Sequence, residues 1–227
     1  MARFPFNVPA REPYAGPGGG IRVFGASRDH GHRLHAGCDL YAPIGTPIFA
    51  IAAGEVILAP YPFYLGTHAI EVFHPGIGVV RYGEVLSPGK YPAFQESLAA
   101  GYARAGIEHP RVITAPHLTN GMPLVEGQLI AAVGKLTGLP NPMLHFELYQ
   151  AAAKGKSLSG GGKFSRSAYL LNPTKLLQDL EHAGSGATRR RSHASTRRST
   201  SASRPWEYAR RSARSCSART APQGRSS

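Results

Sequence analysis

His35-Ala36-Gly37-Cys38-Asp39 is the stretch around which the sequence is organised, because it sets a histidine and a carboxylate four residues apart. In an extended strand successive side chains alternate between the two faces, so His35 and Asp39 would share one face. Cys38 would then point the other way as a small buried hydrophobe, although a role for its thiol as a fourth ligand stays open. The stretch predicts two converging metal ligands.

A second stretch, far downstream, supplies a partner for the first. In residues 143–149 apolar side chains alternate with side chains that can do chemistry. This period of two predicts a strand with one hydrophobic face and one working face. His145 belongs to the working face and is available as a third ligand. Two histidines and one aspartate, with the fourth position left to water, are typical of a catalytic zinc (Zn2+) site rather than a closed structural one.

Further motifs accompany these ligands in a fixed order along the chain. They are Gly45-Thr46-Pro47-Ile48-Phe49-Ala50, Gly54-Glu55-Val56-Ile57, Val125-Glu126-Gly127-Gln128-Leu129-Ile130 and Leu144-His145-Phe146-Glu147. Together with the first stretch they make residues 32–149 resemble the M23, or lysostaphin-type, zinc metallopeptidases. The resemblance implies a mainly β fold built on a small antiparallel sheet, a single zinc ion and cleavage of peptide bonds in the bridges of bacterial peptidoglycan. By motif position it also implies that His35, Asp39 and His145 are the zinc ligands.

The chain departs from this family at two positions. The family usually carries a histidine two residues before its last ligand and another after a Tyr-Gly pair, and the two flank the metal-bound water. Here the first position holds Met143, and the second holds Glu84. Glu84 is the candidate general base, since glutamates take this role in other zinc peptidases, whereas Met143 can neither move a proton nor steady an oxyanion. His117 is a weaker candidate for the missing catalytic role.

Two functions from different classes therefore remain open. The first is an M23-like zinc metallo-endopeptidase that acts weakly on peptide bridges of peptidoglycan, because loss of a positioned base costs roughly 10² to 10⁴ in rate. The second is a catalytically degenerate, zinc-containing module, a pseudoenzyme that binds peptidoglycan or peptide without cleaving it. The acid at Glu84 favours the enzyme, and the loss of both histidines favours the binding module.

The strong positive charge of the chain belongs to its C-terminal segment. The net charge is +13, but residues 184–227 hold 11 arginines and a single acid, Glu207, while the rest of the chain carries 15 basic and 12 acidic residues. Few apolar side chains interrupt this Arg/Ser-rich tail, which predicts disorder. Nucleic-acid binding through the tail would be non-specific and salt-sensitive, and it ranks last among the three functions.

The sequence predicts one folded domain with extensions. Residues 1–20 are expected to form an irregular arm on the surface because their prolines are closely spaced. Residues 21–183 form the M23-like domain, with an insertion at about 87–120 that contains a helix-like piece near Ala93–Ala105, and with a closing helix over Pro173–Glu181. Residues 69–82 predict a hairpin around Pro75-Gly76. His68 and His74 are expected at the surface, where those strands end.

The sequence carries no sign of a membrane span or a secretory signal peptide. The first twenty residues lack a basic start followed by an apolar run, and no apolar run reaches the roughly 18 residues that a spanning helix needs. Cys38 and Cys216 form no disulfide framework. We therefore expect a soluble protein that is cytoplasmic as made, and that would meet peptidoglycan through a dedicated export system or after cell lysis.

Overall fold

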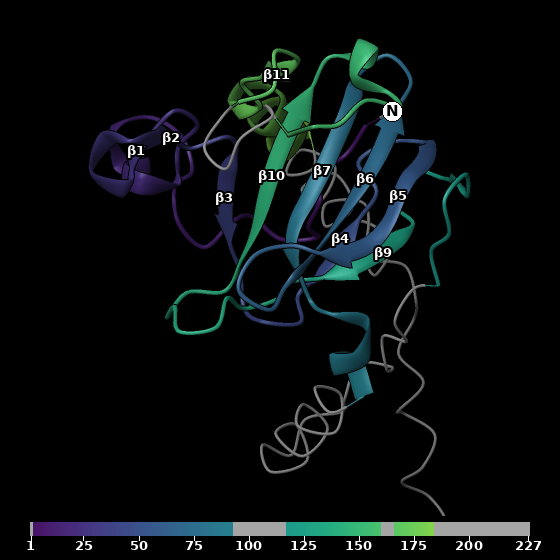
Figure 1. Ribbon diagram of the computed structural model, residues 1–227, viewed down its shortest axis with the longest axis horizontal. Helices are drawn as coiled ribbons and strands as arrows, with labels where there is room; N and C mark the ends of the chain where they lie inside the picture. Colours follow the sequence, from purple (N-terminus) through teal and green to yellow (C-terminus); the bar gives the residue numbers. More distant parts are fainter. Residues whose placement is uncertain (1, 93–116, 160–165, 184–227) are drawn as a thin grey trace, which may run out of the picture. The chain divides into compact units, whose positions relative to one another are not determined.

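One antiparallel sheet organises the part of the chain that the computed structural model describes, namely residues 2–92, 117–159 and 166–183 (Figure 1). Along the sheet the strand order is β11-β10-β7-β6-β5-β8, and β3 also pairs with β10. These strands are β3 (Cys38–Tyr41), β5 (Gly54–Pro62), β6 (His68–His74), β7 (Gly78–Val85), β8 (Pro123–Leu124), β10 (Met143–Tyr149) and β11 (Leu170–Leu171). The predicted fold class, mainly β with an antiparallel sheet, is confirmed.

Short elements surround this sheet. Two small antiparallel pairs are formed by β1 (Ser27–Arg28) with β2 (Arg33–Leu34) and by β4 (Pro47–Phe49) with β9 (Leu129–Ala132). The 3-10 helices are η1 (Pro17–Arg22), η2 (Asp29–Gly31), η3 (Pro88–Lys90) and η4 (Ala151–Ala153). Residues 174–183 are helical, as the sequence predicts after Pro173. The predicted hairpin is the β6–β7 pair, whose register runs up to His74 opposite Gly78.

Strand β10 pairs with other strands along both of its edges. One of its edges pairs with β3 over residues 143–146 and with β11 over residues 148–149, and the other edge pairs with β7. Its predicted alternation is confirmed, because Leu144, Phe146 and Leu148 enter the hydrophobic core on one face. Phe146 meets the ring of Tyr82 there, edge to face, with 5.6 Å between the ring centroids. The opposite face of β10 is left for the polar side chains.

The N-terminal arm lies on the surface only in part, whereas the sequence predicts that all of it does. It is irregular, but Phe4, Phe6 and Tyr14 are buried in the same hydrophobic core as the sheet. The rings of Phe4 and Phe6 meet edge to face at 5.9 Å. The arm also joins the sheet region through its backbone, since the amide of Phe49 donates to the carbonyl of Pro5. The closely spaced prolines predict the absence of regular secondary structure here, but they do not predict whether the aromatic residues between them are buried.

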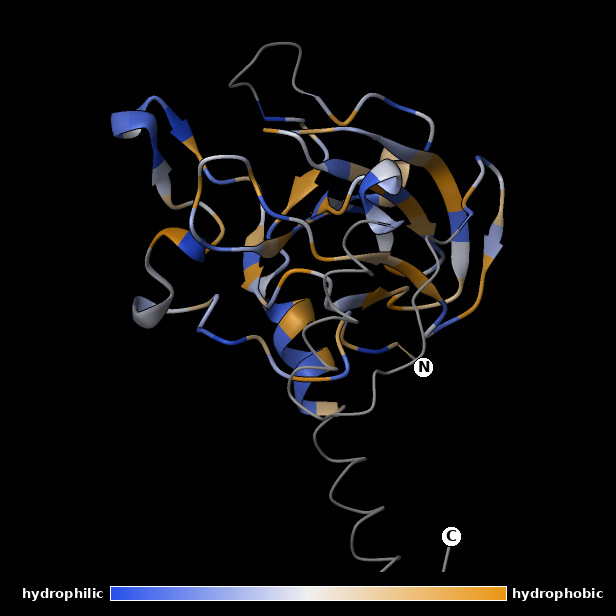
Figure 2. Ribbon diagram, turned by 90° about the horizontal axis from the view of Figure 1, so that it is seen from below, coloured by the Kyte–Doolittle hydropathy of each residue, from blue (hydrophilic) through white to orange (hydrophobic). Residues whose placement is uncertain are grey.

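The helical residues 174–183 close the core on the side of the arm. Leu177 and Leu180 are buried in the core, while polar residues between them face solvent, and Figure 2 shows both kinds of residue on this segment. The Tyr14 hydroxyl donates to Glu181 at 2.8 Å, and the Ala10 amide lies 3.3 Å from the same carboxylate. The two ends of the described chain therefore hold each other in place.

His74 is a second correction, because its ring is completely buried rather than at the surface. Its Nδ1 lies 3.2 Å from the carbonyl oxygen of Ala53, and its Nε2 lies 3.0 Å from the hydroxyl of Tyr82. The amide of Ile51 donates to that hydroxyl oxygen at 3.2 Å. Burial lowers the pKa of His74, so the ring is neutral within this network.

Some expectations fall outside the described residues. Every described residue belongs to one unit of the chain, which does not include residues 188–227. The predicted helix near Ala93–Ala105, most of the insertion and the Arg/Ser-rich tail lie in the parts that are not described, so these remain predictions. Within the described residues, none of the helices has the length and apolar character needed to cross a membrane.

Candidate metal centre

The first ligand stretch is bent rather than extended. Strand β3 begins at Cys38, so His35 precedes it in an irregular segment with a bend at Gly37. The bend brings the backbone against β10 so closely that a Cβ on Gly37 would lie 2.4 Å from the carbonyl oxygen of Phe146. A glycine is therefore required at this position. The expectation of one continuous strand through His35 and Asp39 is wrong, but both side chains still reach the same point.

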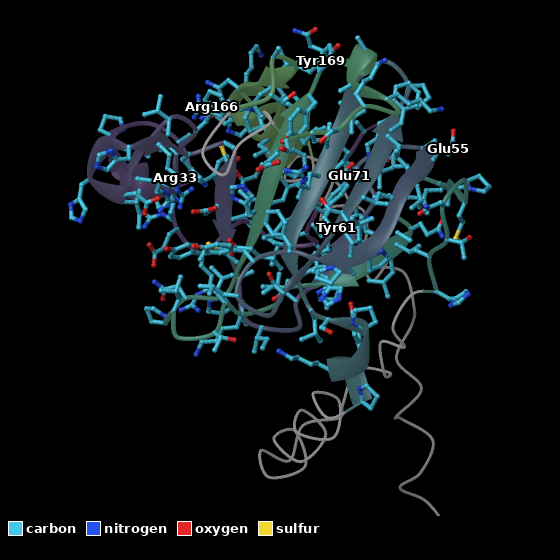
Figure 3. All side chains as sticks on the ribbon, viewed as in Figure 1. Arg33, Glu55, Tyr61, Glu71, Arg166 and Tyr169 are labelled. Carbon is cyan, nitrogen blue, oxygen red and sulfur yellow. The ribbon has the colours of Figure 1, made fainter. Side chains whose placement is uncertain are left out.

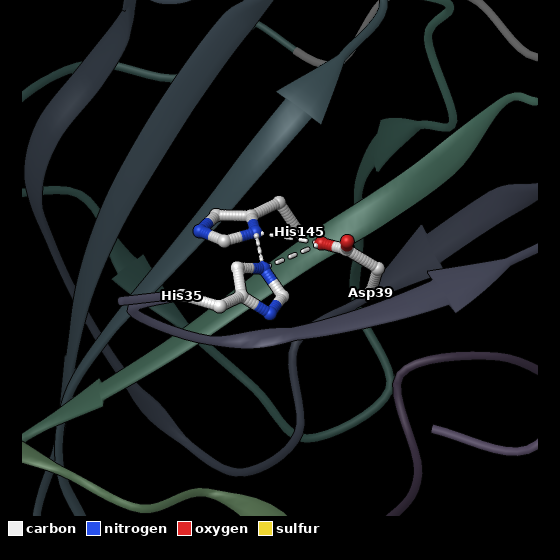
Figure 4. Close-up of side chains that lie close together, drawn as sticks. All are labelled: His35, Asp39 and His145. Atoms are coloured by element: carbon white, nitrogen blue, oxygen red, sulfur yellow. Dashed lines mark hydrogen bonds and ion pairs between the residues drawn. The ribbon is translucent and has the colours of Figure 1, made fainter. Parts of the chain in front are cut away.

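Three potential ligand atoms meet there (Figure 4). His35 Nε2 lies 3.0 Å from Asp39 Oδ1 and 3.1 Å from His145 Nδ1, and the last two atoms are 2.8 Å apart. In a tetrahedral zinc site, with ligand distances of about 2.0–2.1 Å, neighbouring ligand atoms are separated by about 3.3 Å. The register of the sheet explains the meeting, because His145 on β10 stands directly opposite Asp39 on β3. The three residues that the sequence predicts as ligands are thus brought together.

The outer nitrogens of both histidines fix which ring atom faces the centre. His35 Nδ1 donates to the carbonyl oxygen of Val23 at 2.8 Å, and His145 Nε2 donates to Glu147 Oε1 at 2.9 Å. Each ring therefore has its remaining nitrogen turned toward Asp39. Two lone pairs and a carboxylate oxygen within about 3 Å of one another repel unless a positive charge lies among them. A divalent cation meets this requirement, so the residues fit a zinc ion.

The pKa shifts of His35, Asp39 and His145 also reflect a need for positive charge at this point. Burial alone would lower the pKa of His145, but its hydrogen bonds with Asp39 and Glu147 raise that pKa well above its usual range. Burial alone would raise the pKa of Asp39, yet the hydrogen bonds from His145 and His35 hold it well below its usual range. Burial lowers the pKa of His35. The raised pKa of His145, between two carboxylates, marks a place where positive charge is favoured.

Glu147 is the residue that orients His145, and sequence reasoning gave it no role. Its Oε1 accepts from His145, and its Oε2 accepts from Arg81 Nη1 at 2.8 Å and from the Tyr149 hydroxyl. Arg81 also forms an ion pair with Glu71, with 3.0 Å between Nη2 and Oε1. Burial alone would raise the pKa of Glu147, but the hydrogen bond from His145 and the nearby charges lower it to about 2. The sequence did hold one indication of this role, because Glu147 lies two residues from His145 and therefore on the same face of the strand.

Arg28 plays a comparable part for Asp39. Its Nη2 donates to Asp39 Oδ2 at 2.7 Å, which leaves Oδ1 as the oxygen that faces the two histidines. Arg28 lies on β1, eleven residues before Asp39, in a loop region that the sequence did not connect with the ligands. Cys38 is not a candidate ligand in the structure. It is fully buried in the core, and its thiol lies beside the hydroxyl of Thr174. The interpretation of Cys38 as a small buried hydrophobe is confirmed.

Glu84 lines the cleft because β7 is irregular at this point. Between Tyr82, which pairs with Ile70, and Val85, which pairs with His68, two residues of β7 oppose one of β6. In a regular strand Glu84 would share the core face of Tyr82, but this bulge turns it instead into the cleft that holds the three ligands. Its φ angle is +60°, which is unfavourable for a residue other than glycine. Burial raises the pKa of Glu84 to about 7.

The cleft around the ligands has a volume of about 920 Å³. Met143 and Glu84 both line it, whereas the exposed His117 is not among its lining residues. The structure therefore places Glu84 at the wall of the cleft that contains the proposed ligands, whereas His117 is not part of that wall. The Phe63 ring lies against His145, with 6.3 Å between the ring centroids. Apolar side chains such as Leu136, Leu139 and Leu170 make up much of the remaining wall.

Comparisons with known proteins give matches among solved structures only. No protein-family model matches the chain, and no curated protein sequence does. The antimicrobial peptidase lysostaphin from Staphylococcus simulans matches at 19% identity over 80% of this chain and 50% of that chain, with a TM-score of 0.43, so this chain spans half the length of that protein. The catalytic domain of lysostaphin matches at 21% identity over 68% of this chain and 88% of that chain, again with a TM-score of 0.43.

A third match is a mutant of the catalytic domain of the prophage-encoded M23 protein EnpA from Enterococcus faecalis. It has 19% identity over 62% of this chain and 77% of that chain, with a TM-score of 0.37. These three structures are of lysostaphin or of an M23 protein, the family that the sequence motifs of this chain resemble.

Proposed function

We propose that this chain is a zinc metallo-endopeptidase of the M23 type that cleaves peptide bridges of bacterial peptidoglycan slowly. The observation that carries this proposal is the convergence of one atom each from His35, Asp39 and His145, within 3.1 Å of one another, at the wall of a large cleft. The second polar atom of each of these side chains is held by another group of the protein. Such orientation by outer partners is typical of built metal sites.

The protein's residues divide the work at this centre. His35, Asp39 and His145 would hold the zinc ion, which when bound polarises a peptide carbonyl and makes water a better nucleophile at neutral pH. Glu147 keeps His145 in the tautomer that presents Nδ1, and Arg28 keeps Asp39 presenting Oδ1. The ring of Phe63 shields one side of His145 from solvent. Together these contacts fix the ligand geometry before any substrate arrives.

Glu84 is the proposed general base. A base works best when its pKa lies near the working pH, and burial raises the pKa of this carboxyl to about 7. At neutral pH it can therefore accept a proton from the attacking water and return that proton to the leaving amine. The bulge that turns Glu84 into the cleft, at the cost of a positive φ angle, is the local structure expected at a functional position.

Met143 explains why the proposed rate is low. It lies buried at the cleft wall, two residues before His145 on the same strand face. A thioether donates no hydrogen bond, so the developing oxyanion lacks a partner on this side. Removal of one such donor costs roughly 10² to 10³ in rate in other hydrolases. The same observation supports the second candidate function, a zinc-containing module that holds peptidoglycan or peptide in this cleft without cutting it.

One set of variants separates the two functions. Wild-type protein should contain one zinc per chain and release fragments slowly from purified peptidoglycan. Glu84→Gln should reduce the rate at least about a hundredfold with zinc content unchanged, because only the base is lost. Met143→His should raise the rate by restoring a donor for the oxyanion. The matched control is Glu55→Gln, which changes a partly exposed glutamate on β5 outside the cleft and should have no effect.

The binding module makes the opposite claims. Zinc-loaded wild-type protein would sediment with peptidoglycan but release nothing, and Met143→His would switch cleavage on. Full zinc occupancy in a His35→Ala, His145→Ala double variant would contradict both functions, because the ion would then be bound elsewhere. Cys38→Ser should retain zinc in either case.

A further inference from the structure

In the part of the chain that the structure describes, four arginines line the cleft, and they differ in which acidic residues neutralise them. Arg28 pairs with Asp39 at 2.7 Å, Arg33 pairs with Asp29 at 2.7 Å, and Arg81 pairs with both Glu71 and Glu147. Arg166 forms no ion pair with any of the described residues. Figure 3 shows Arg166 and Arg33 on the side of the sheet where β1, β2 and β3 lie, whereas Glu71 lies over β6.

Arg166 is nevertheless held firmly beside the metal centre. Its Nη2 donates to the main-chain carbonyl oxygen of His35, the first of the three proposed ligands. Its guanidinium also stacks on the ring of Phe24, with 4.9 Å between the central carbon and the ring centroid. Its Nε is shielded from solvent and has no hydrogen-bond partner among the described residues. The side chain is therefore oriented by contacts in which no described residue compensates its charge.

This arrangement of Arg166 lowers the stability of the protein when no anion is bound to it. A guanidinium that loses part of its hydration without gaining an anion is destabilising, and buried donors without partners are uncommon in folded proteins. Apolar residues nearby in the cleft wall, including Leu158 and Leu170, strengthen any interaction that the charge makes. From these contacts we propose that Arg166 is an anion subsite, which binds a carboxylate of the peptide substrate in the cleft. This inference rests on the proposed function, because it assigns a substrate feature to the same cleft.

The chemistry of the site favours a carboxylate over a more highly charged anion. One uncompensated guanidinium matches one negative charge, and its planar fork suits the two oxygens of a carboxylate. The contact with the carbonyl oxygen of His35 sets Arg166 next to the three ligands, so the bound carboxylate lies near the peptide bond that is cut. The cleft therefore selects peptides that carry a carboxylate close to the scissile bond.

Binding measurements test this subsite without depending on cleavage. The protein is zinc-loaded Glu84→Gln, and the probes are N-acetyl-Ala-Gly-Gly with a free carboxylate and the same peptide as its C-terminal amide. We expect the free acid to bind about tenfold or more tightly by calorimetry, because charge-assisted hydrogen bonds are stronger than neutral ones. Adding Arg166→Gln should reduce this preference to whatever the metal alone provides. A third probe, the amide N-acetyl-Glu-Gly-Gly, distinguishes a side-chain carboxylate from a terminal one.

The matched control is Arg33→Gln in the same background. It removes an equal charge from the same cleft, but from an arginine whose charge Asp29 already compensates. The acid–amide preference should survive this change. Zinc content must be equal in all three proteins, so that a carboxylate bound directly to the metal contributes equally in each. Arg166→Lys should keep part of the preference, since it retains the charge without the planar fork.

The outcomes separate this inference from the proposed function. Equal binding of acid and amide, binding of neither at millimolar concentration, or a preference that persists undiminished in Arg166→Gln would overturn the subsite. An equal loss of preference in Arg33→Gln would also overturn it, because the general potential of the cleft would then be responsible. A protein that prefers the acid through Arg166 but releases nothing from peptidoglycan would retain the subsite while losing the enzyme.

Discussion

Glu84 shows how a single residue can be poorly suited to its backbone and well suited to chemistry. Its φ angle of +60° interrupts β7, and glycine would adopt this angle more easily than any other residue. A conformation of this kind costs about 1–3 kcal/mol. The surrounding sheet maintains it, because the Gly134 amide donates to the carbonyl oxygen of Glu84 at 2.9 Å. The local strain and the position of the carboxyl group in the cleft have the same cause.

The positive φ angle at Glu84 predicts an unusual order of stability among variants at this position. Glu84→Gly should be about 1 kcal/mol more stable toward unfolding than Glu84→Ala, because only glycine relieves the strain. Both variants should lose hydrolysis equally. At Glu55, a β5 residue without positive φ, the order should be the usual one, with Glu55→Ala more stable than Glu55→Gly. Urea unfolding of the four proteins checks this, and the same order at both sites would argue against strain at Glu84.

Glu147 should matter for zinc affinity more than for folding. Glu147→Gln weakens the hydrogen bond that orients His145, and loss of such outer partners typically costs 10- to 100-fold in metal affinity. Competition with a chromophoric chelator measures this change directly. Glu71→Gln is the matched control, because it removes a carboxylate from the same Arg81 but does not touch a ligand. Equal effects of the two substitutions would mean that the negative charge beside Arg81 determines the zinc affinity, rather than the contact between Glu147 and His145.

At the scale of elements, β10 was the most predictable part of the sequence. The alternation of Leu144, Phe146 and Leu148 with polar residues depends only on the local two-residue period of a strand, and it correctly placed His145 on the working face. The bulge in β7 was not predictable, because it arises from the way β7 pairs with β6 rather than from the local composition of β7. The position of Glu84 could therefore be predicted only through the family resemblance.

The β6–β7 hairpin contains a hydrogen-bond network that depends on a neutral histidine. With His74 Nδ1 donating to Ala53, Nε2 accepts the proton of the Tyr82 hydroxyl, whose oxygen accepts from Ile51. A protonated ring would need to donate through Nε2 as well. The Tyr82 hydroxyl would then lose its own acceptor. Protonation of His74 therefore conflicts with the folded hairpin.

This network predicts an acid sensitivity with a definite sign. The folded protein keeps His74 neutral because burial lowers its pKa, whereas the unfolded chain protonates it below about pH 6.5. The unfolded state then binds more protons, so stability falls as the pH drops below about 6.5, by at most about 1.4 kcal/mol per pH unit. In His74→Gln the pH slope of stability, measured by urea unfolding between pH 5 and 7, should be flatter. His32→Gln, at an exposed ring, should keep the wild-type slope.

At the scale of the whole molecule, the arm and the C-terminal helical segment complete the core from opposite ends of the described chain. Tyr14 and Glu181 are 167 residues apart in sequence, yet they share a hydrogen bond. The buried position of Phe4 and Phe6 makes the arm part of the domain's packing. Removal of the arm would therefore expose core residues rather than trim a surface segment.

The arm should contribute strongly to stability. Phe6→Ala should reduce the free energy of unfolding by about 3–5 kcal/mol, because the ring is only 3% exposed and truncation leaves a cavity. Val8→Ala, two residues along and 56% exposed, should change it by less than about 0.5 kcal/mol. Thermal or urea unfolding of both variants measures the difference. Similar small effects at both positions would show that the arm packs loosely.

Long-range contacts set the limit of what the sequence could predict. The proposed ligands His35, Asp39 and His145 were identified from the order of the motifs, although a continuous strand through the first two was the wrong local structure. Arg166 reaches the carbonyl oxygen of His35 across 131 residues, and no periodicity or spacing points to such a contact. The burial of Phe6 has the same origin, since proline spacing describes the backbone and not its surroundings.

The pairing of His145 opposite Asp39 also has a consequence for assembly of the sheet. If β10 slipped by one residue against β3, every side chain of β10 would change faces, and His145 would turn into the core while Phe146 turned outward. Only the correctly aligned sheet presents all three donor atoms at one point. Zinc uptake during refolding would thus act as a proofreading step, retaining chains in the native alignment and leaving slipped ones without metal.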